Sequence, residues 1–451
     1  MSKNIQLKKG FDIKLVGQAQ PSVATIEQPE TFAVKPTDFA GFQRPKVLVK
    51  EGDTVKAGDV LFFDRKQEDV MYTAPVSGEV VEIKRGAQRK LLEVIILADK
   101  QIEYKQFSVP SIADLSLEQA KATMLESGVW PQIVQRPFAV VANSEVTPRA
   151  VFISGFDSHP LAPDFEFLYK GQEKYLQAGI DVLKKFTSDV HVNINSAASS
   201  SIFANLNGVT VNKVSGPHPA GNVGVQIHHI APIAGAEDVV WTLNPTGLAQ
   251  IGKLFTEGIY DTKKLVAIAG SEVESPEYVE TYGGARLNKV VAAKVKNSHV
   301  RIISGNVLTG ESVGKDGYLG YYDQLVTVLP EGDKPRFFLT DGWLGFITDR
   351  LSFHRAFGLL GGKNKTYKLD TSLNGEERAF VMTGAFEKVL PMDIYPTYLL
   401  KAIMAGDYEE MEALGIYEVA EEDLALCEFI DVSKHDVQAM IREGIEMLRL
   451  S

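Results

Sequence analysis

The histidine-rich stretch at residues 216–233, GPHPAGNVGVQIHHIAPI, has the residue types best suited to chemistry. It contains three of the eight histidines, together with three glycines and three prolines. The prolines and glycines exclude a helix at its start. We therefore expect an ordered loop at the end of a strand in an α/β unit, where ligands often bind. Within it, His228 and His229 are expected to point to opposite faces of an extended segment. Two interpretations stay open: a packed connector, or a loop that contacts a ligand or a partner.

Residues 350–365 form a second stretch suited to contacting a partner, because Gly, Lys, Arg and His alternate there with apolar side chains that include Phe353 and Phe357. This composition fits a surface loop packed on a core, or a basic, aromatic loop that contacts a partner protein. A third polar group, Asp157 and His159 before a proline, is expected to be a solvated turn without a catalytic role.

Groups that carry electrons or bind nucleotides are scarce. Cys427 is the only cysteine, which excludes an intrachain disulfide and a cysteine-ligated iron–sulfur cluster held by this chain alone. A lone cysteine in an apolar stretch is usually a small buried hydrophobic residue. The glycine-rich patterns G-x-G-x-x-G and G-x-x-x-x-G-K-[ST] do not occur. The side chains themselves offer no hydride or one-electron carrier.

The bulk composition is that of a folded acidic protein. The 451 residues are 45% hydrophobic and 23% charged, and 47 basic against 58 acidic residues give a net charge of −11. This balance argues against nucleic acid and against direct adhesion to anionic lipid. No apolar run approaches the ~18 residues of a membrane helix, and the charged N-terminus lacks a signal core. We expect a cytoplasmic protein whose association with a membrane depends on a partner.

The N-terminal domain, assigned to residues 1–105, carries a specific fold signal. Residues 44–97 follow the pattern V-x-x-G-D-x-V-x-x-G-x-x-L and then A-P-x-x-G-x-V, which resembles the biotinyl/lipoyl barrel-sandwich domain. In biotin carriers of that family the modified lysine lies eight residues before the proline. Gln67 occupies that position here, and Lys66 is one residue out of register. The resemblance therefore implies the fold without the swinging arm.

The rest of the chain is predicted to be α/β, with strands alternating with helices after residue 115. Ser116 and Asn244 should cap helices, residues 196–206 are predicted to be helical, and Asp436 should open a final helix with an apolar stripe. The predicted units are an α/β Rossmann-like domain at 115–257, a β-grasp (SLBB-like) module at 258–345, a connecting segment at 346–391 and a C-terminal helical domain at 392–451.

Five segments together resemble one family over nearly the whole chain. They are the opening IQLKKGFDIKLVG, the barrel-sandwich motif, the histidine stretch with the later WTLNPTGLAQIGKLFTEG, SGNVLTGE at 304–311, and residues 395–434. The sequence resembles the A subunit of the bacterial sodium-translocating NADH:quinone oxidoreductase. That family is similar in fold to the flavin- and NADH-binding subunit of complex I and to the C subunit of Rnf complexes.

The resemblance implies a place in a respiratory complex. The family is the peripheral, cytoplasmic-side component of a six-subunit pump in the bacterial inner membrane, which couples NADH oxidation and ubiquinone reduction to sodium export. It implies docking on the membrane subunits, chiefly the B subunit. NADH, flavins and iron–sulfur centres belong to other subunits, so we expect neither cofactor, metal nor catalytic residue in this chain.

The resemblance also leaves alternatives for the site. Ubiquinone is a candidate partner, because a quinone head group needs an apolar slot and a hydrogen-bond donor for each carbonyl. The quinone-proximal candidates are His218, His228, His229, Phe353, His354 and Phe357. A flavin-binding NADH dehydrogenase subunit is the alternative, although its G-x-G-G-x-G-F-P loop has no match here. A prosthetic-group carrier modified on Lys66 and a ligand-free scaffold are further alternatives.

Overall fold

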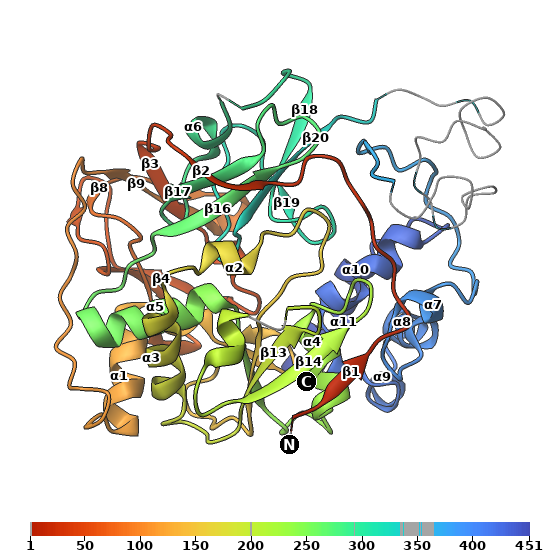
Figure 1. The fold of residues 1–451 in the computed structure, drawn as a ribbon, viewed down its shortest axis with the longest axis horizontal. Coiled ribbons are helices and arrows are strands. Elements are labelled where there is room, and N and C mark those ends of the chain that lie inside the picture. The colour runs from red at the N-terminus through yellow and green to blue at the C-terminus, as the bar shows by residue number, and fades with distance from the viewer. Residues whose placement is uncertain are drawn as a thin grey trace.

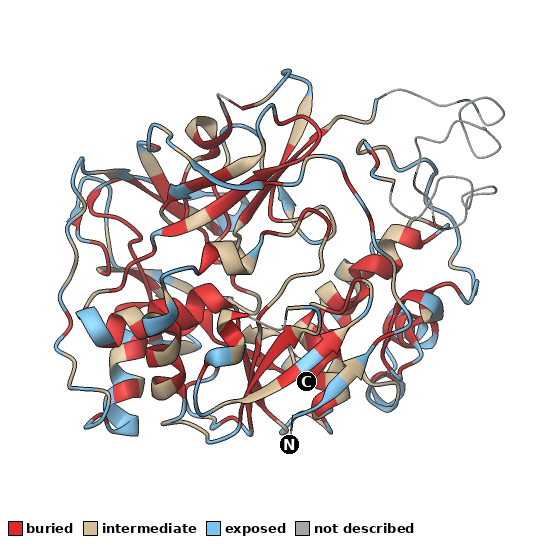
Figure 2. Ribbon diagram, in the orientation of Figure 1, coloured by how far each residue is buried: buried red, intermediate tan, exposed pale blue. Residues whose placement is uncertain are grey.

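The computed structural model describes residues 2–198, 201–292, 294–333, 337, 351, 353 and 365–451. Within this part of the chain the strands form four sheets. Figure 1 shows the barrel-sandwich strands at one end of the longest axis and the C-terminal helices at the other. The two large sheets lie between them, and Figure 2 shows that their strands are mostly buried.

The barrel-sandwich domain consists of two small sheets whose glycine turns match the predicted pattern. One sheet has the order β3 (Thr31–Val34), β9 (Leu91–Ala98), β8 (Gly78–Arg85), β5 (Thr54–Val55). The other has the order β4 (Pro45–Val47), β6 (Val60–Asp64), β7 (Gln67–Thr73). Leu61, Phe62 and Val80 are fully buried between them. Gln67 Nε2 donates to Ala142 O at 2.7 Å, so the hairpin tip that carries the lysine in biotin carriers rests on the next domain.

The Rossmann-like domain is built on a seven-stranded sheet. Its order is β1 (Asn4–Gln6), β14 (Thr210–Ser215), β13 (Val190–Asn195), β12 (Val151–Ser154), β15 (Val240–Leu243), β10 (Val134–Arg136), β11 (Val140–Val141). The strands from β1 to β15 are parallel, and β10 runs antiparallel to β15. Its helices are α1 (Leu117–Ser127), α2 (Phe165–Leu168), α3 (Glu173–Leu183), α4 (Val223–Ile230) and α5 (Pro245–Glu257).

Local signals in the sequence predicted the ends of α1 and α5 correctly. Ser116 accepts a hydrogen bond from Gln119 N and forms a capping box, and α1 ends at a left-handed glycine. Asn244 caps α5 by accepting from Gly247 N. Helices α3 and α5 cross closely, because a Cβ on Gly252 would lie 1.8 Å from Tyr175 O. Only glycine permits this approach.

Two segments differ from the prediction. Residues 196–206 were predicted to be helical, but their described part contains only a short 3-10 turn at Ile202–Asn205. Residues 216–233 were predicted to be an extended loop, but they contain helix α4. The apolar residues Val223, Val225 and Ile227 alternate as in a strand, yet Ile230 extends them into a helical face, and burial in the core selects the helix.

The SLBB-like module has a six-stranded sheet. Its order is β19 (Glu311–Ser312), β18 (Val300–Ser304), β20 (Leu325–Pro330), β16 (Lys264–Ala269), β17 (Glu277–Thr281), β2 (Gln20–Ala24). Helix α6 (Leu287–Ala292) belongs to the same module. The core of this sheet is apolar, and Val266, Val279 and Val326 are fully buried.

The N-terminal residues cross between the two large sheets. Strand β1 pairs in parallel with β14, and β2 pairs in parallel with β17. The N-terminal trace in Figure 1 runs from the edge of one sheet to the edge of the other. Residues 4–24, which the sequence assigned to the barrel-sandwich domain, therefore supply one strand to each of the other two sheets.

The C-terminal part is helical, as predicted. Residues 392–451 contain α8 (Pro396–Ala405), α9 (Tyr408–Ala413), α10 (Glu421–Ile430) and α11 (Val437–Leu450), and α7 (Phe386–Val389) precedes them in the segment predicted to be a connection. Asp436 caps α11, and Val437, Ile441 and Ile445 of the predicted stripe are buried. In the part of the chain that is described, no helix has the length and apolar character needed to cross a membrane.

Candidate functional site

His218 lies in the loop between β14 and α4 and is anchored by the N-terminal segment. Its backbone N donates to Asp12 Oδ1 at 2.9 Å, and Phe11 N donates to His218 O at 2.9 Å. Gly10 lies so close that a Cβ there would be 2.2 Å from His218 O. The histidine is 1% exposed. This loop therefore depends on a segment about two hundred residues earlier in the chain.

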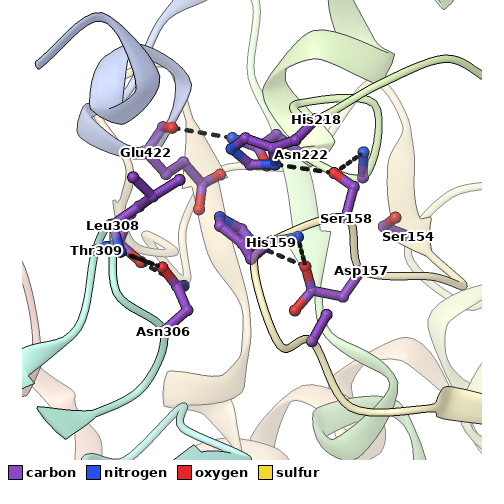
Figure 3. Close-up of polar contacts among 12 residues, drawn as sticks. Ser154, Asp157, Ser158, His159, His218, Asn222, Asn306, Leu308, Thr309 and Glu422 are labelled. Atoms are coloured by element: carbon purple, nitrogen blue, oxygen red, sulfur yellow. Dashed lines mark hydrogen bonds and ion pairs between the residues drawn. The ribbon is translucent and has the colours of Figure 1, made fainter. Parts of the chain in front are cut away.

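The His218 ring is held at one nitrogen by Ser158. Its Nδ1 lies 3.0 Å from Ser158 Oγ, which also accepts a hydrogen bond from Gly221 N at 2.8 Å. Burial, and then the neighbouring His159, lower the pKa of His218 to about 3. The ring is therefore neutral at physiological pH. Figure 3 shows this hydrogen bond and the neighbouring His159.

Asp157 and His159 form a second anchored pair beside it. Asp157 Oδ1 accepts from His159 N at 2.8 Å and lies 2.6 Å from its ring Nδ1. Burial acts to lower the pKa of His159, but the Asp157 carboxylate raises it, and the net direction is upward. The rings of His159 and His218 are 4.6 Å apart. The side chains of His159 and Asp157 are 13% and 23% exposed, so the turn is only partly solvated and is less open than predicted.

Glu422 and Asp423, at the start of α10, complete this group together with Arg136. We call it the histidine pair site, and it consists of Asp157–His159, His218, Asn222, Glu422, Asp423 and Arg136. Arg136 Nη1 donates to Asp423 Oδ2 at 3.3 Å and Nη2 to Glu422 Oε1 at 2.7 Å. Asn222 Nδ2 donates to the Glu422 carbonyl at 2.9 Å. Five of its buried polar atoms have no hydrogen-bond partner among the described residues: His159 Nε2, His218 Nε2, Asn222 Oδ1, Arg136 Nε and Asp423 Oδ1. Buried polar atoms normally have partners, so these are available to a ligand.

The other two histidines of the stretch have a structural role. His228 Nδ1 lies 2.7 Å from Glu418 Oε2, and its Nε2 accepts from Asp393 N at 2.9 Å. His229 Nε2 lies 2.7 Å from Pro391 O. Both rings therefore bind α4 to the C-terminal part of the chain, at Pro391, Asp393 and Glu418. They do not face opposite sides of an extended segment, because both lie on the last turn of α4.

The aromatic candidates are placed only in part. Phe353 packs edge-on against Phe11, with ring centroids 5.5 Å apart, and Phe11 stacks on Phe429 at 6.5 Å. Phe353 therefore contacts the side chain of a residue whose backbone N–H binds His218 O. His354 and Phe357 lie outside the described residues.

A second site, which sequence reasoning missed, is a cavity where the three N-terminal domains meet. We call it the junction cavity. Its enclosed volume is about 30 Å³, and the space between its walls, including the open mouth, is about 520 Å³. Its polar and aromatic lining includes Lys35, Asp38, Tyr72, Gln132, Tyr260, Lys264 and Tyr321. These residues are scattered over residues 35–321, so no local pattern could have grouped them.

Buried charges dominate this cavity. Lys35 Nζ lies 3.1 Å from Asp38 Oδ1, and Asp38 Oδ2 accepts from Tyr321 N at 2.9 Å. Burial nevertheless raises the pKa of Asp38 to about 6. Lys264 Nζ donates to two backbone carbonyls, Tyr321 O at 3.1 Å and Asp323 O at 2.7 Å. Burial lowers the pKa of Lys264 to about 8. One N–H of that ammonium is not used in these hydrogen bonds.

Metal ligands are not gathered at either site. Among the described residues, no group of three or more His, Cys, Asp and Glu side chains lies close enough to hold a metal ion. Cys427 is fully buried in α10, and burial raises the pKa of its thiol. The protonated, enclosed thiol is unsuited to metal binding.

Comparison with known proteins gives consistent matches in each domain. Residues 5–99 match the NqrA N-terminal barrel-sandwich hybrid domain, residues 115–260 the NqrA second alpha/beta domain, and residues 265–315 the NQRA C-terminal domain, an SLBB domain. A crystal structure of an NAD⁺-reducing [NiFe]-hydrogenase in the air-oxidized state shares 15% identity over 49% of each chain at a TM-score of 0.34, which is too low to support a functional argument.

Full-length relatives show the same pattern. The A subunit of the Na(+)-translocating NADH-quinone reductase of Serratia proteamaculans is 38% identical over 97% of this chain and 98% of its own length. The corresponding protein of Neisseria meningitidis serogroup B is 35% identical over 98% of this chain and 99% of its own. The chain therefore belongs to the NqrA family, the A subunits of Na(+)-translocating NADH-quinone reductase.

Proposed function

We propose that this chain is the peripheral component of a pump that couples NADH oxidation and quinone reduction to sodium export, and that it forms part of the quinone site. The relatives named for this activity match it along nearly their whole length. We place it on the cytoplasmic side of the bacterial inner membrane, docked chiefly on the membrane-embedded B subunit. Exposed aromatic and apolar side chains on α8, on α9 and at the residue before α8 support a docking role, namely Tyr395, Tyr398, Met404 and Tyr408.

The junction cavity is the observation that carries the quinone proposal. A quinone head group is a flat ring with two carbonyl acceptors. Tyr72 and Tyr260 offer ring surfaces, and Lys264 offers an unused N–H donor. The enclosed 30 Å³ holds about two water molecules. A ring therefore enters only when side chains in the cavity wall move.

The histidine pair site is the second candidate for the quinone. It contains the sequence-predicted His218, and its two unpartnered ring nitrogens would suit a carbonyl or a hydroxyl group. His228 and His229 are weaker candidates, because three of their four ring nitrogens already bond to residues 391–418.

We further propose that the chain itself holds neither flavin nor iron–sulfur cluster. One fully buried thiol, Cys427, cannot ligate a cluster that needs several thiolates, and the flavin-binding glycine loop of the complex I relative has no match. The absorbance spectrum of the purified chain tests this proposal. Stoichiometric flavin would instead support a flavin-binding NADH dehydrogenase subunit.

The quinone proposal is tested with a photo-crosslinking quinone analogue on the assembled complex, followed by mass spectrometry of labelled peptides. We expect label within residues 33–38, 128–132 or 260–264 that excess quinone displaces. Label within 216–233 would favour the histidine pair site. Label confined to the membrane subunits would overturn quinone binding here and leave a docking role.

Adjacent lysines provide a matched pair of variants. Lys264 is 8% exposed in the cavity wall, whereas the neighbouring Lys263 side chain is 41% exposed and pairs with Glu280. Lys264→Met should raise the KM for quinone about tenfold or more, since hydrogen bonds from charged groups contribute ~1.5–3 kcal/mol. Lys263→Met should leave it unchanged. Equal effects of both variants, at equal thermal stability, would contradict the role of the cavity.

A further inference from the structure

The hairpin between β8 and β9 carries an unusual concentration of positive charge. Its tip, residues 84–90 with the sequence KRGAQRK, has four cations in seven residues. Arg85, Arg89 and Lys90 are exposed, and the side chain of Lys84 is 50% exposed. Figure 1 shows β8 and β9 at the opposite end of the molecule from the C-terminal helices. We call this segment the basic hairpin tip.

Most of these charges are not neutralised within the protein. Lys84 pairs with Glu93 on the adjacent strand at 3.1 Å. Arg85 Nη1 donates to the backbone carbonyl of Arg89 at 3.2 Å. In the part of the chain that is described, Arg85, Arg89 and Lys90 make no ion pair with a carboxylate. A protein of net charge −11 thus presents three unpaired cations side by side.

The backbone of the tip turns through two left-handed residues. Gln88 has φ 53° and Arg89 has φ 61°, in the left-handed region that L-residues with side chains rarely adopt. Tight hairpins normally place Asn or Gly at such positions. The turn is closed within the chain, because Gly86 N donates to Lys90 O at 2.9 Å and Lys90 N donates to Ala87 O at 3.0 Å. This closed turn leaves Gln88 and Arg89 exposed at the end of the hairpin.

The chemistry of the tip fits phosphate groups. Guanidinium groups bind phosphate oxygens in pairs, and a lysine ammonium adds a point charge. The acidic remainder of the molecule does not prevent this, because charges beyond ~8 Å are largely screened at physiological ionic strength. Cytoplasmic loops of membrane subunits are themselves enriched in Lys and Arg and would repel the tip. The anion on that face of a bacterial membrane is the phospholipid headgroup.

We propose that the basic hairpin tip binds the headgroups of anionic phospholipids and gives the protein a second, direct attachment to the membrane. This inference rests on the peripheral location proposed above. It also revises the expectation from net charge that the chain avoids anionic lipid, because the relevant charge is local. Arg85, Arg89 and Lys90 are the residues that make the contact.

The test is co-sedimentation of the purified full chain with vesicles of phosphatidylcholine alone or mixed with phosphatidylglycerol. We expect at least tenfold stronger binding to the phosphatidylglycerol vesicles at low salt, lost as salt is raised. The variant Arg85→Gln, Arg89→Asn, Lys90→Gln should lose this preference. Its thermal stability should be equal or higher, because Asn tolerates the left-handed position.

A matched control variant loses three positive charges elsewhere on the surface. Lys50, Lys100 and Lys170 are also exposed, and their joint replacement by Gln should keep the vesicle preference. Equal loss in both triple variants would overturn the proposal in favour of net charge. Competition by inorganic phosphate at constant ionic strength, without any vesicle preference, would overturn it in favour of a free anion.

A further experiment uses the complex assembled with the membrane subunits. Normal vesicle binding by the hairpin variant, combined with loss of assembly with the membrane subunits, would overturn the proposal and assign the tip to an acidic protein segment. The vesicle assay contains no quinone, so its failure is distinguishable from failure of the proposed function, which is read from quinone labelling.

Discussion

At the residue scale, the buried ion pair of Arg136 with Asp423 joins the Rossmann-like domain to the C-terminal helices. The side chains are 4% and 0% exposed. Burial raises the pKa of Asp423 even though Arg136 favours its charged form. The pair therefore keeps two charges in surroundings that disfavour charged groups. Removing one partner would leave the other as an unpaired buried charge.

Arg136→Ala should lower the free energy of unfolding by about 3–5 kcal/mol, because it leaves a buried carboxylate without its partner. Denaturant unfolding measures the change. Arg136→Met combined with Asp423→Asn removes both charges and should recover much of the loss. Arg149→Ala breaks a more exposed pair with Asp238 and should cost less than ~1 kcal/mol. Similar costs for Arg136→Ala and Arg149→Ala would contradict the importance of burial.

Asp38 in the junction cavity should make stability depend on pH in the direction opposite to an ordinary ion-paired carboxylate. Its pKa is raised from 3.8 to about 6, chiefly by burial. Between these values the folded chain keeps a proton that the unfolded chain has lost, so stability falls as pH rises from about 4 to 6. The loss is on the order of 3 kcal/mol. It levels off above pH 6.

Asp38→Asn should remove this dependence. Unfolding midpoints at pH 4.5 and 6.5 compare the two proteins, and the wild type should lose more stability than the variant over this interval. If the stabilities of the wild type and the variant changed equally with pH, burial would have no effect on the ionisation of Asp38 in the folded protein.

Sequence patterns predicted individual residues well where the determinant is local. The caps Ser116, Asn244 and Asp436 each accept from the amide three residues later, so their role can be recognised in a short stretch of sequence. Asp38 and Lys264 could not be grouped in this way. They come from different domains, and only the packing of those domains creates the cavity.

At the element scale, α4 is the element whose structure was predicted least accurately from the sequence. Its last turn carries His228 and His229, which bond to Glu418, Asp393 and Pro391. A short apolar run with both strand and helix periodicity is decided by its surroundings. The family resemblance identified the stretch as distinctive but did not reveal that two of its histidines are structural.

His228→Ala with His229→Ala should loosen the C-terminal helices without unfolding the sheet. Each lost hydrogen bond costs about 0.5–1.5 kcal/mol. We expect faster hydrogen exchange in residues 386–419 and unchanged exchange in β13 and β14. His299→Ala, at an exposed pair with Asp333, is the control. Unchanged exchange in the C-terminal helices would show that these histidines do not hold them.

The crossing of α3 and α5 is sensitive to a single methyl group. Gly252→Ala should destabilise the protein by about 1–3 kcal/mol, because the added Cβ meets the Tyr175 carbonyl and pushes the helices apart. Gly235→Ala has no heavy atom within 4 Å of the new Cβ and serves as the control. Thermal unfolding compares the two. Equal melting temperatures would mean that the crossing adjusts without cost.

At the scale of the whole molecule, the N-terminal strands β1 and β2 join domains that were predicted from the sequence to be separate. Deleting residues 2–24 removes an edge strand from each large sheet. We expect a lower melting temperature and protease cleavage within residues 134–330, while the barrel-sandwich core at 31–98 stays resistant. Lys8→Gln with Lys9→Gln, exposed between the two strands, should change neither property. An unaltered digestion pattern after the deletion would show that the sheets are complete without these strands.

The placement of β1 and β2 also has a consequence for biosynthesis. β2 leaves the ribosome early, but its partner β17 begins at residue 277. At bacterial elongation rates of ~5–20 residues per second, roughly 10–50 seconds separate the two. During this interval the barrel-sandwich core can fold while the segment before it remains without its partners. The first residues synthesised are thus among the last to reach their native place, and they are an expected binding site for nascent-chain chaperones.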